Sequence, residues 1–126
     1  MSTPVTPSRP DTVLVVDDEA AVRSLVCLLL RREGYAVLDA DCAEEGLRLA
    51  AGHAGPIDLL VADLRMPGMD GTELATRLAA ARPDLRVLYL SGDPSLSPEA
   101  PGAAAFMPKP FSPHQLTSKV RELLDA

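Results

Sequence analysis

The chain alternates between short apolar runs and longer segments whose apolar residues recur every three or four positions. Five apolar runs have the length of strands, at residues 13–16, 35–40, 57–62, 86–90 and 104–107. The segments with helical spacing lie at residues 19–33, 41–52, 72–81 and 112–124. This alternation predicts one α/β domain, built on a parallel sheet with right-handed crossover helices.

Polar residues mark several of the predicted helix ends. Ser112 stands three residues before Gln115, which predicts a reciprocal capping box at the start of the last helix. Asp70 is placed to cap the third helix, and Asp41 is a candidate cap for the second. These caps give the expected helices defined starting points.

Composition narrows the possible functions. The chain has 126 residues, enough for one domain, and 47% of them are hydrophobic, enough for a real core. The net charge of -6 argues against nucleic acid binding and favours a cation or a basic partner surface. No apolar run approaches the ~20 residues of a membrane helix, and no signal peptide is visible, so we expect a cytoplasmic protein that binds no membrane. Residues 1–11, rich in Pro, Ser and Thr, are expected to form a disordered lead before a domain at 12–126.

Chemically active side chains follow four of the five predicted strands. Asp17 and Asp18 follow the first strand, and Asp63 follows the third. Ser91 follows the fourth strand and Lys109 the fifth. The carboxyl ends of parallel strands lie at one edge of the sheet, where such folds bind ligands, so these side chains should meet there.

Three carboxylates in one pocket repel each other unless a cation compensates them. Mg²⁺ prefers oxygen ligands and commonly uses one or two carboxylates together with phosphate oxygens. One carboxylate would remain free as a nucleophile, and Asp63 is the best candidate because the Pro- and Gly-containing turn after its strand exposes it. Lys109 and Ser91 would then hold the oxygens of an incoming phosphoryl group.

The motifs VVDDE, VADLRMPGMDG, LSGD and FMPKPF resemble those of the receiver domain of bacterial two-component response regulators, over residues 12–124. The resemblance implies a flavodoxin-like doubly wound sheet of strand order 2-1-3-4-5. It implies that Asp63 accepts a phosphoryl group from a phosphohistidine on a histidine kinase or a histidine phosphotransfer protein, and that the domain switches conformation to act on a downstream protein target. Such a domain is not an enzyme beyond slow self-dephosphorylation.

The resemblance also assigns the remaining site residues. Asp18, Asp63 and the backbone carbonyl of Arg65 would bind Mg²⁺, with Asp17 helping directly or through water. Ser91 and Phe106 would form the conformational switch, and the bond before Pro110 would be cis. Arg65 and Asp93 occupy positions that tune phosphoryl lifetime, and we expect them to form an ion pair over the site. An unchanged dephosphorylation rate in Arg65→Ala would contradict that pairing.

Two segments depart from the family pattern. Residues 92–105 contain three prolines and are short for the usual fourth helix, so we expect helix four to be shortened or missing. Pro108 lies in the fifth strand, which is tolerable if that strand is at the edge of the sheet. In the first helix, Leu25 and Leu28 should face partly outward, and the resemblance implies a kinase-docking role for them.

Two other functions are compatible with parts of the pattern. A Mg²⁺-dependent phosphohydrolase also uses an Asp nucleophile, but it resembles a D-x-D signature, whereas Asp17 and Asp18 are adjacent here. A pseudo-receiver would bind partners without phosphorylation, but it normally lacks residues that this chain retains. The pattern names neither the cognate kinase nor the target, and a stand-alone regulator and a hybrid-kinase receiver are both compatible with it.

Overall fold

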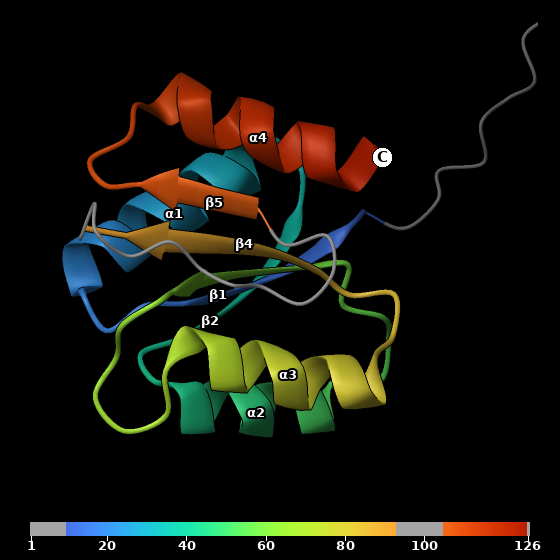
Figure 1. Cartoon of the computed structure of the whole chain (residues 1–126). Helices are drawn as coiled ribbons and strands as arrows, with labels where there is room; N and C mark the ends of the chain where they lie inside the picture. The colour runs from blue at the N-terminus through green and yellow to red at the C-terminus, as the bar shows by residue number, and fades with distance from the viewer. Residues whose placement is uncertain (1–9, 93–104, 126) are drawn as a thin grey trace, which may run out of the picture.

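The computed structural model of the chain describes residues 10–92 and 105–125 (Figure 1). Five parallel strands form one sheet in the order β2-β1-β3-β4-β5. Their bounds are β1 Thr12–Val16, β2 Ala36–Ala40, β3 Leu59–Asp63, β4 Arg86–Ser91 and β5 Ala105–Pro108. The predicted α/β class and strand order are confirmed.

The described helices cover both faces of the sheet. They are α1 Ala20–Arg32, α2 Ala43–Gly52, α3 Gly71–Ala81 and α4 Pro113–Asp125. Helices α1 and α4 lie on one face, and α2 and α3 lie on the other (Figure 1). Every residue of β1 and β3 is buried because these central strands are covered on both sides.

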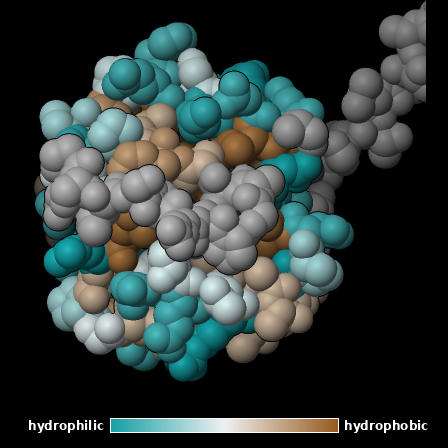
Figure 2. All heavy atoms as spheres, viewed as in Figure 1, coloured by the Kyte–Doolittle hydropathy of each residue, from teal (hydrophilic) through white to brown (hydrophobic). Residues whose placement is uncertain are grey.

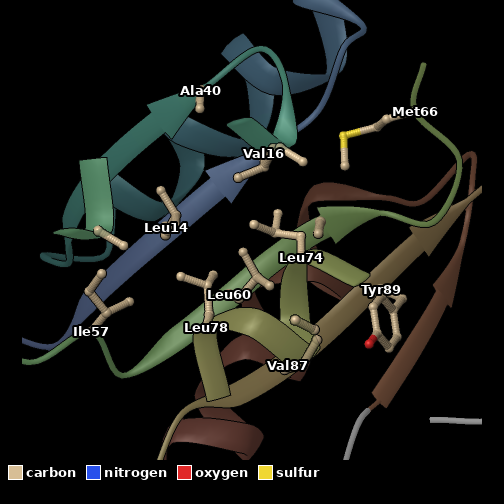
Figure 3. Close-up of a cluster of buried hydrophobic side chains, with 14 of the residues drawn as sticks. Leu14, Val16, Ala40, Ile57, Leu60, Met66, Leu74, Leu78, Val87 and Tyr89 are labelled. Carbon is tan, nitrogen blue, oxygen red and sulfur yellow. The ribbon is translucent and has the colours of Figure 1, made fainter. Parts of the chain in front are cut away.

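Two apolar layers hold the helices to the sheet. The layer beneath α2 and α3 includes Leu14, Leu60, Leu74 and Tyr89, all nearly or fully buried (Figure 3). The opposite layer packs the alternate residues of the same strands against α1 and α4. In the space-filling view, the most hydrophobic atoms lie in the band between α4 and α3, at the β5 side of the sheet (Figure 2). The sheet is therefore a rigid base for residues at the ends of its strands.

The third strand begins and ends later than its apolar pattern predicts. Asp58 precedes β3 and accepts a hydrogen bond from the Thr12 N–H through its carboxylate, at 2.7 Å. Its own N–H donates to the Thr12 carbonyl oxygen at 2.8 Å. Asp58 thus anchors the start of β1 to the chain entering β3, and the strand extends to Asp63.

Two of the three predicted helix caps are confirmed. Ser112 and Gln115 exchange hydrogen bonds, at 2.8 and 3.1 Å, as a capping box requires. The Asp70 carboxylate accepts from the Glu73 N–H at 3.0 Å. The expected cap at Asp41 is wrong, because α2 begins one residue later and its N-cap is Cys42, with no side-chain cap.

Two expectations lie mostly outside the described residues. The first is the lead at residues 1–11. The second is the segment at residues 92–105, between β4 and β5, where the usual fourth helix of the family is expected to be shortened or missing. That shortening therefore stays a prediction.

Pro108 does end an edge strand, as expected. Among the described residues, no helix is long and apolar enough to span a membrane.

Candidate functional site

The carboxyl ends of the two central strands bring three aspartates together. Asp17 and Asp18 directly follow β1, and Asp63 is the last residue of β3. One carboxylate oxygen of each lies within 4.8 Å of those of the other two. Asp17 and Asp63 are buried, whereas Asp18 is exposed. The acidic cluster predicted at this edge of the sheet is therefore formed.

Lys109 reaches into this cluster from the end of β5. Its Nζ lies 3.0 Å from Asp17 Oδ2 and 3.1 Å from Asp63 Oδ2. It also donates to Glu19 Oε1 at 2.8 Å. The Lys109 side chain is only 11% exposed and that of Asp17 only 1%. Lys109 is thus the positive charge that makes the buried carboxylates tolerable.

The local environment shifts two pKa values in the cluster. Burial raises the pKa of Asp17, and this effect exceeds the opposing effects of the Glu19 backbone N–H and of Lys109. Burial alone would lower the pKa of Lys109, but the carboxylates of Glu19, Asp17 and Asp63 together raise it. Lys109 therefore remains charged in this site.

The donor atoms suit a hard divalent cation. All three aspartates offer carboxylate oxygens, the ligand type that Mg²⁺ prefers. Asp17 Oδ2 is buried and, within the described part of the chain, receives no well-directed hydrogen bond, although Lys109 Nζ is near it. A buried carboxylate oxygen without a directed donor is costly, and metal coordination would satisfy it. The residues present could therefore hold a metal ion.

The turn after β3 fixes the Asp63 carboxylate from the other side. The Arg65 N–H donates to Asp63 Oδ1 at 3.2 Å, and the Arg65 side chain is exposed. Gly68 has a φ of 80°, which favours glycine at this point of the turn. Asp70 then caps α3. The turn thus orients one oxygen of Asp63, while Lys109 contacts the other.

Gly71, the first residue of α3, packs directly on the backbone of Asp63. A Cβ atom on Gly71 would lie 2.4 Å from the Asp63 carbonyl oxygen and 3.1 Å from its carbonyl carbon. The Gly71 N–H also donates to the Leu64 carbonyl oxygen at 3.1 Å. Any larger residue would have to displace the backbone that presents Asp63.

Gly71→Ala is expected to lower the free energy of unfolding by about 3 kcal/mol, because its added methyl group meets backbone and not a movable side chain. Urea unfolding followed by circular dichroism measures the change. Gly52→Ala is the matched control: among the described residues nothing lies within 4 Å of its added Cβ, and it should be neutral or stabilise by up to about 1 kcal/mol. Equal stabilities of the two variants would contradict the steric argument.

The other predicted site residues occupy the neighbouring strands. Ser91 is buried at the end of β4, and its carbonyl oxygen accepts from the Lys109 N–H at 2.7 Å. Phe106 is half-buried on β5, opposite Tyr89 in the sheet register. The Lys109–Pro110 bond is cis, as expected. Asp93 lies outside the described residues, so its pairing with Arg65 stays a prediction.

Glu19 lies at the mouth of the site, although it is not among the site residues that the sequence predicts. Its carboxylate pairs with Lys109, and its N–H donates to Asp17 Oδ1 at 2.9 Å. The available signal was its position as the third acid of the run after β1. Glu19 adds a partly exposed carboxylate that shares the lysine with the two buried aspartates.

The outward face of α1 carries the two leucines that the helical pattern places there. Leu25 is 40% exposed and Leu28 is 49% exposed, as predicted. Leu30 and Val26, on the opposite side of the helix, are fully buried against the sheet. The docking role that the resemblance implies for the exposed leucines stays a prediction.

Several known proteins are similar to this chain in sequence and in fold. The chain is 37% identical to the sensor kinase CckA of Brucella abortus, over 90% of this chain and 12% of that protein. It is 36% identical to the response regulator MprA of a Mycobacterium species, over 91% of this chain and 51% of the relative. The chain therefore spans about half the length, or less, of these curated relatives.

Solved structures agree over nearly the whole chain. A CheY-like receiver domain protein from Methanospirillum hungatei is 34% identical with a TM-score of 0.82, covering 92% of this chain and 94% of that one. The receiver domain of the hybrid histidine kinase CckA is 38% identical with a TM-score of 0.79, covering 90% and 98%. Residues 13–121 match the response regulator receiver domain, a signalling phosphoacceptor. The chain therefore belongs to the response regulator receiver domain family.

Proposed function

We propose that Asp63 is the phosphoacceptor of this receiver domain. The observation that carries the proposal is the position of Lys109 Nζ, 3.0 and 3.1 Å from buried carboxylates that come from two different strands. This arrangement holds the Asp63 carboxylate in place at the end of β3, as an attacking carboxylate requires. Asp17, Asp18, Asp63 and the Arg65 carbonyl would hold Mg²⁺.

The phosphoryl donor in this proposal is a phosphohistidine on a sensor kinase or a phosphotransfer protein. An Asp63 carboxylate oxygen attacks the phosphorus, a P–O bond forms, and the P–N bond to the imidazole breaks. The Lys109 ammonium and the Ser91 hydroxyl hold the phosphoryl oxygens in place. Bound Mg²⁺ supplies further positive charge for those oxygens.

Phosphorylation then shifts the domain between two conformations. Ser91 and Phe106 are the proposed switch, because they lie on adjacent strands next to the site and Phe106 is only half-buried. The phosphorylated state must favour one arrangement of these side chains, since equal affinity for both would shift nothing. The output is binding to a downstream protein, and the domain itself turns over its acyl phosphate only slowly.

Intact mass after incubation with phosphoramidate, with and without Mg²⁺, tests the proposal. Phosphoramidate carries the same P–N bond as phosphohistidine and needs no partner protein. We expect a gain of one phosphoryl group per chain that requires Mg²⁺. Continuous phosphate release would favour a phosphohydrolase, and no gain despite Mg²⁺ binding would favour a pseudo-receiver.

A further inference from the structure

Within the described part of the chain, hydrogen bonds hold both the main chain and the carboxylate of Asp17, and one of them comes from a side chain outside the acidic cluster. The Asp17 N–H donates to the Ala40 carbonyl oxygen at 3.2 Å. Its Oδ1 accepts from the Glu19 N–H at 2.9 Å. Its backbone carbonyl oxygen accepts from Arg23 Nη1 at 2.7 Å. Main chain and carboxylate are therefore both held.

Arg23 extends back from the first turn of α1 to reach this carbonyl. Its side chain is 20% exposed, so the guanidinium is largely shielded from water. A charged donor at 2.7 Å to a carbonyl oxygen is a short and strong hydrogen bond. Arg23 Nε also lies 3.8 Å from Asp39 Oδ2 on β2, which gives the guanidinium a second support.

We propose that Arg23 is a positioning residue for the cation site. By holding the Asp17 carbonyl, it restricts rotation of the Asp17 main chain and so keeps the carboxylate aimed at Lys109 and the cation position. Partners that orient metal ligands commonly change metal affinity by 10–100-fold when removed. This inference rests on the proposed function, because it takes Asp17 to be a metal ligand.

Simple electrostatics gives the opposite expectation for Arg23. Its guanidinium is a positive charge close to a site proposed to bind a cation. If charge alone mattered, removing Arg23 would reduce repulsion and tighten Mg²⁺ binding. If positioning dominates, removing Arg23 weakens binding. The sign of the change therefore separates the two effects.

Isothermal titration of matched variants with MgCl₂ measures whether the Mg²⁺ dissociation constant rises or falls when Arg23 is replaced. Arg23→Met keeps the apolar stem of the side chain but loses its charge and donors, whereas Arg23→Gln loses the charge and retains an N–H donor on a shorter side chain. We expect about 10-fold weaker Mg²⁺ binding in Arg23→Met and partial recovery in Arg23→Gln. Arg31→Met is the control, since Arg31 also lies 3.8 Å from Asp39, is 54% exposed, and donates its hydrogen bond to the Val37 carbonyl oxygen; this variant should bind Mg²⁺ as wild type does.

Urea unfolding without Mg²⁺ separates a purely structural role from positioning. A structural role lowers stability and leaves the Mg²⁺ dissociation constant of the folded protein unchanged, which would overturn the proposal. Unchanged or tighter Mg²⁺ binding in Arg23→Met, or equal weakening in Arg31→Met, would overturn it as well. If Arg23→Met does not fold, Asp39→Asn, which loosens the second support, should weaken binding by about threefold, and unchanged binding would contradict the proposal.

Failure of the proposed function would be visible in the wild type. A wild-type chain that binds no Mg²⁺ and gains no phosphoryl group from phosphoramidate would remove the basis of both proposals. A wild type that does both, with Arg23→Met binding Mg²⁺ equally well, would leave Asp63 as the phosphoacceptor and reject only the role of Arg23.

Discussion

Asp63→Asn is expected to abolish phosphorylation by phosphoramidate. The amide oxygen of asparagine is a far weaker nucleophile than a carboxylate. Among the described acids, only Asp63 is both the last residue of a strand and in contact with Lys109 Nζ. Asp17 is the nearest competitor, but its Oδ1 is held by the Glu19 N–H and its Oδ2 is fully buried. Intact mass should show no gain in the variant and one phosphoryl group in the wild type.

Asp84→Asn is the matched control for this experiment. Asp84 is an exposed aspartate just before β4, so it lies at the amino ends of the strands, away from the site at their carboxyl ends. The same substitution there should leave phosphorylation unchanged. Circular dichroism of both variants would verify that each is folded. Full phosphorylation of Asp63→Asn would place the acceptor elsewhere, and peptide mapping would then locate it.

The fold could be predicted because each level of the sequence pattern agrees with the others. The strands are short apolar runs and the helices have 3.6-residue spacing, so the alternation alone indicated a parallel sheet. A parallel sheet places the carboxyl ends of its strands at one edge, which brings Asp17, Asp63 and Lys109 together. The strand topology is therefore enough to predict which side chains gather in the site.

Details that depend on contacts between distant segments could not be predicted. Glu19 and Lys109 are 90 residues apart, and no local pattern indicates that they pair. The contact between Gly71 and the Asp63 backbone depends on how closely α3 approaches β3. The sequence spacing predicts a cap at Asp41, whereas Cys42 is the N-cap of α2 in the structure. In each case packing between distant segments decided a detail that the local sequence leaves open.

Asp17 is held in the site although its charge is buried and lies close to the Asp63 carboxylate. Its carboxylate is buried next to another carboxylate, an arrangement that costs free energy unless a cation is near. The surrounding backbone hydrogen bonds keep it there, and Lys109 neutralises part of the charge. The fold thus tolerates a locally costly group of charges at this end of the sheet, as the proposed Mg²⁺ and phosphoryl site requires.

Lys109→Met is therefore expected to destabilise the Mg²⁺-free domain by about 3 kcal/mol. The substitution keeps most of the side-chain volume but leaves Asp17 and Asp63 buried without their shared cation. Urea unfolding in the presence of a chelator measures the loss. Lys119→Met is the control: Lys119 pairs with Glu122 on the surface of α4, where an ion pair contributes at most about 1 kcal/mol.

Added Mg²⁺ should restore much of the stability of Lys109→Met and should stabilise this variant more than the wild type. A ligand that binds only the folded state stabilises it in proportion to the logarithm of its concentration relative to Kd. In the variant, Mg²⁺ no longer shares the carboxylates with an ammonium group, so its binding should be tighter. Stability that is equal to wild type without Mg²⁺, or that does not respond to Mg²⁺, would show that Lys109 does not compensate these carboxylates. Because phosphoryl transfer also needs a group to hold the transferred oxygens, the restored variant should still be phosphorylated more slowly than the wild type.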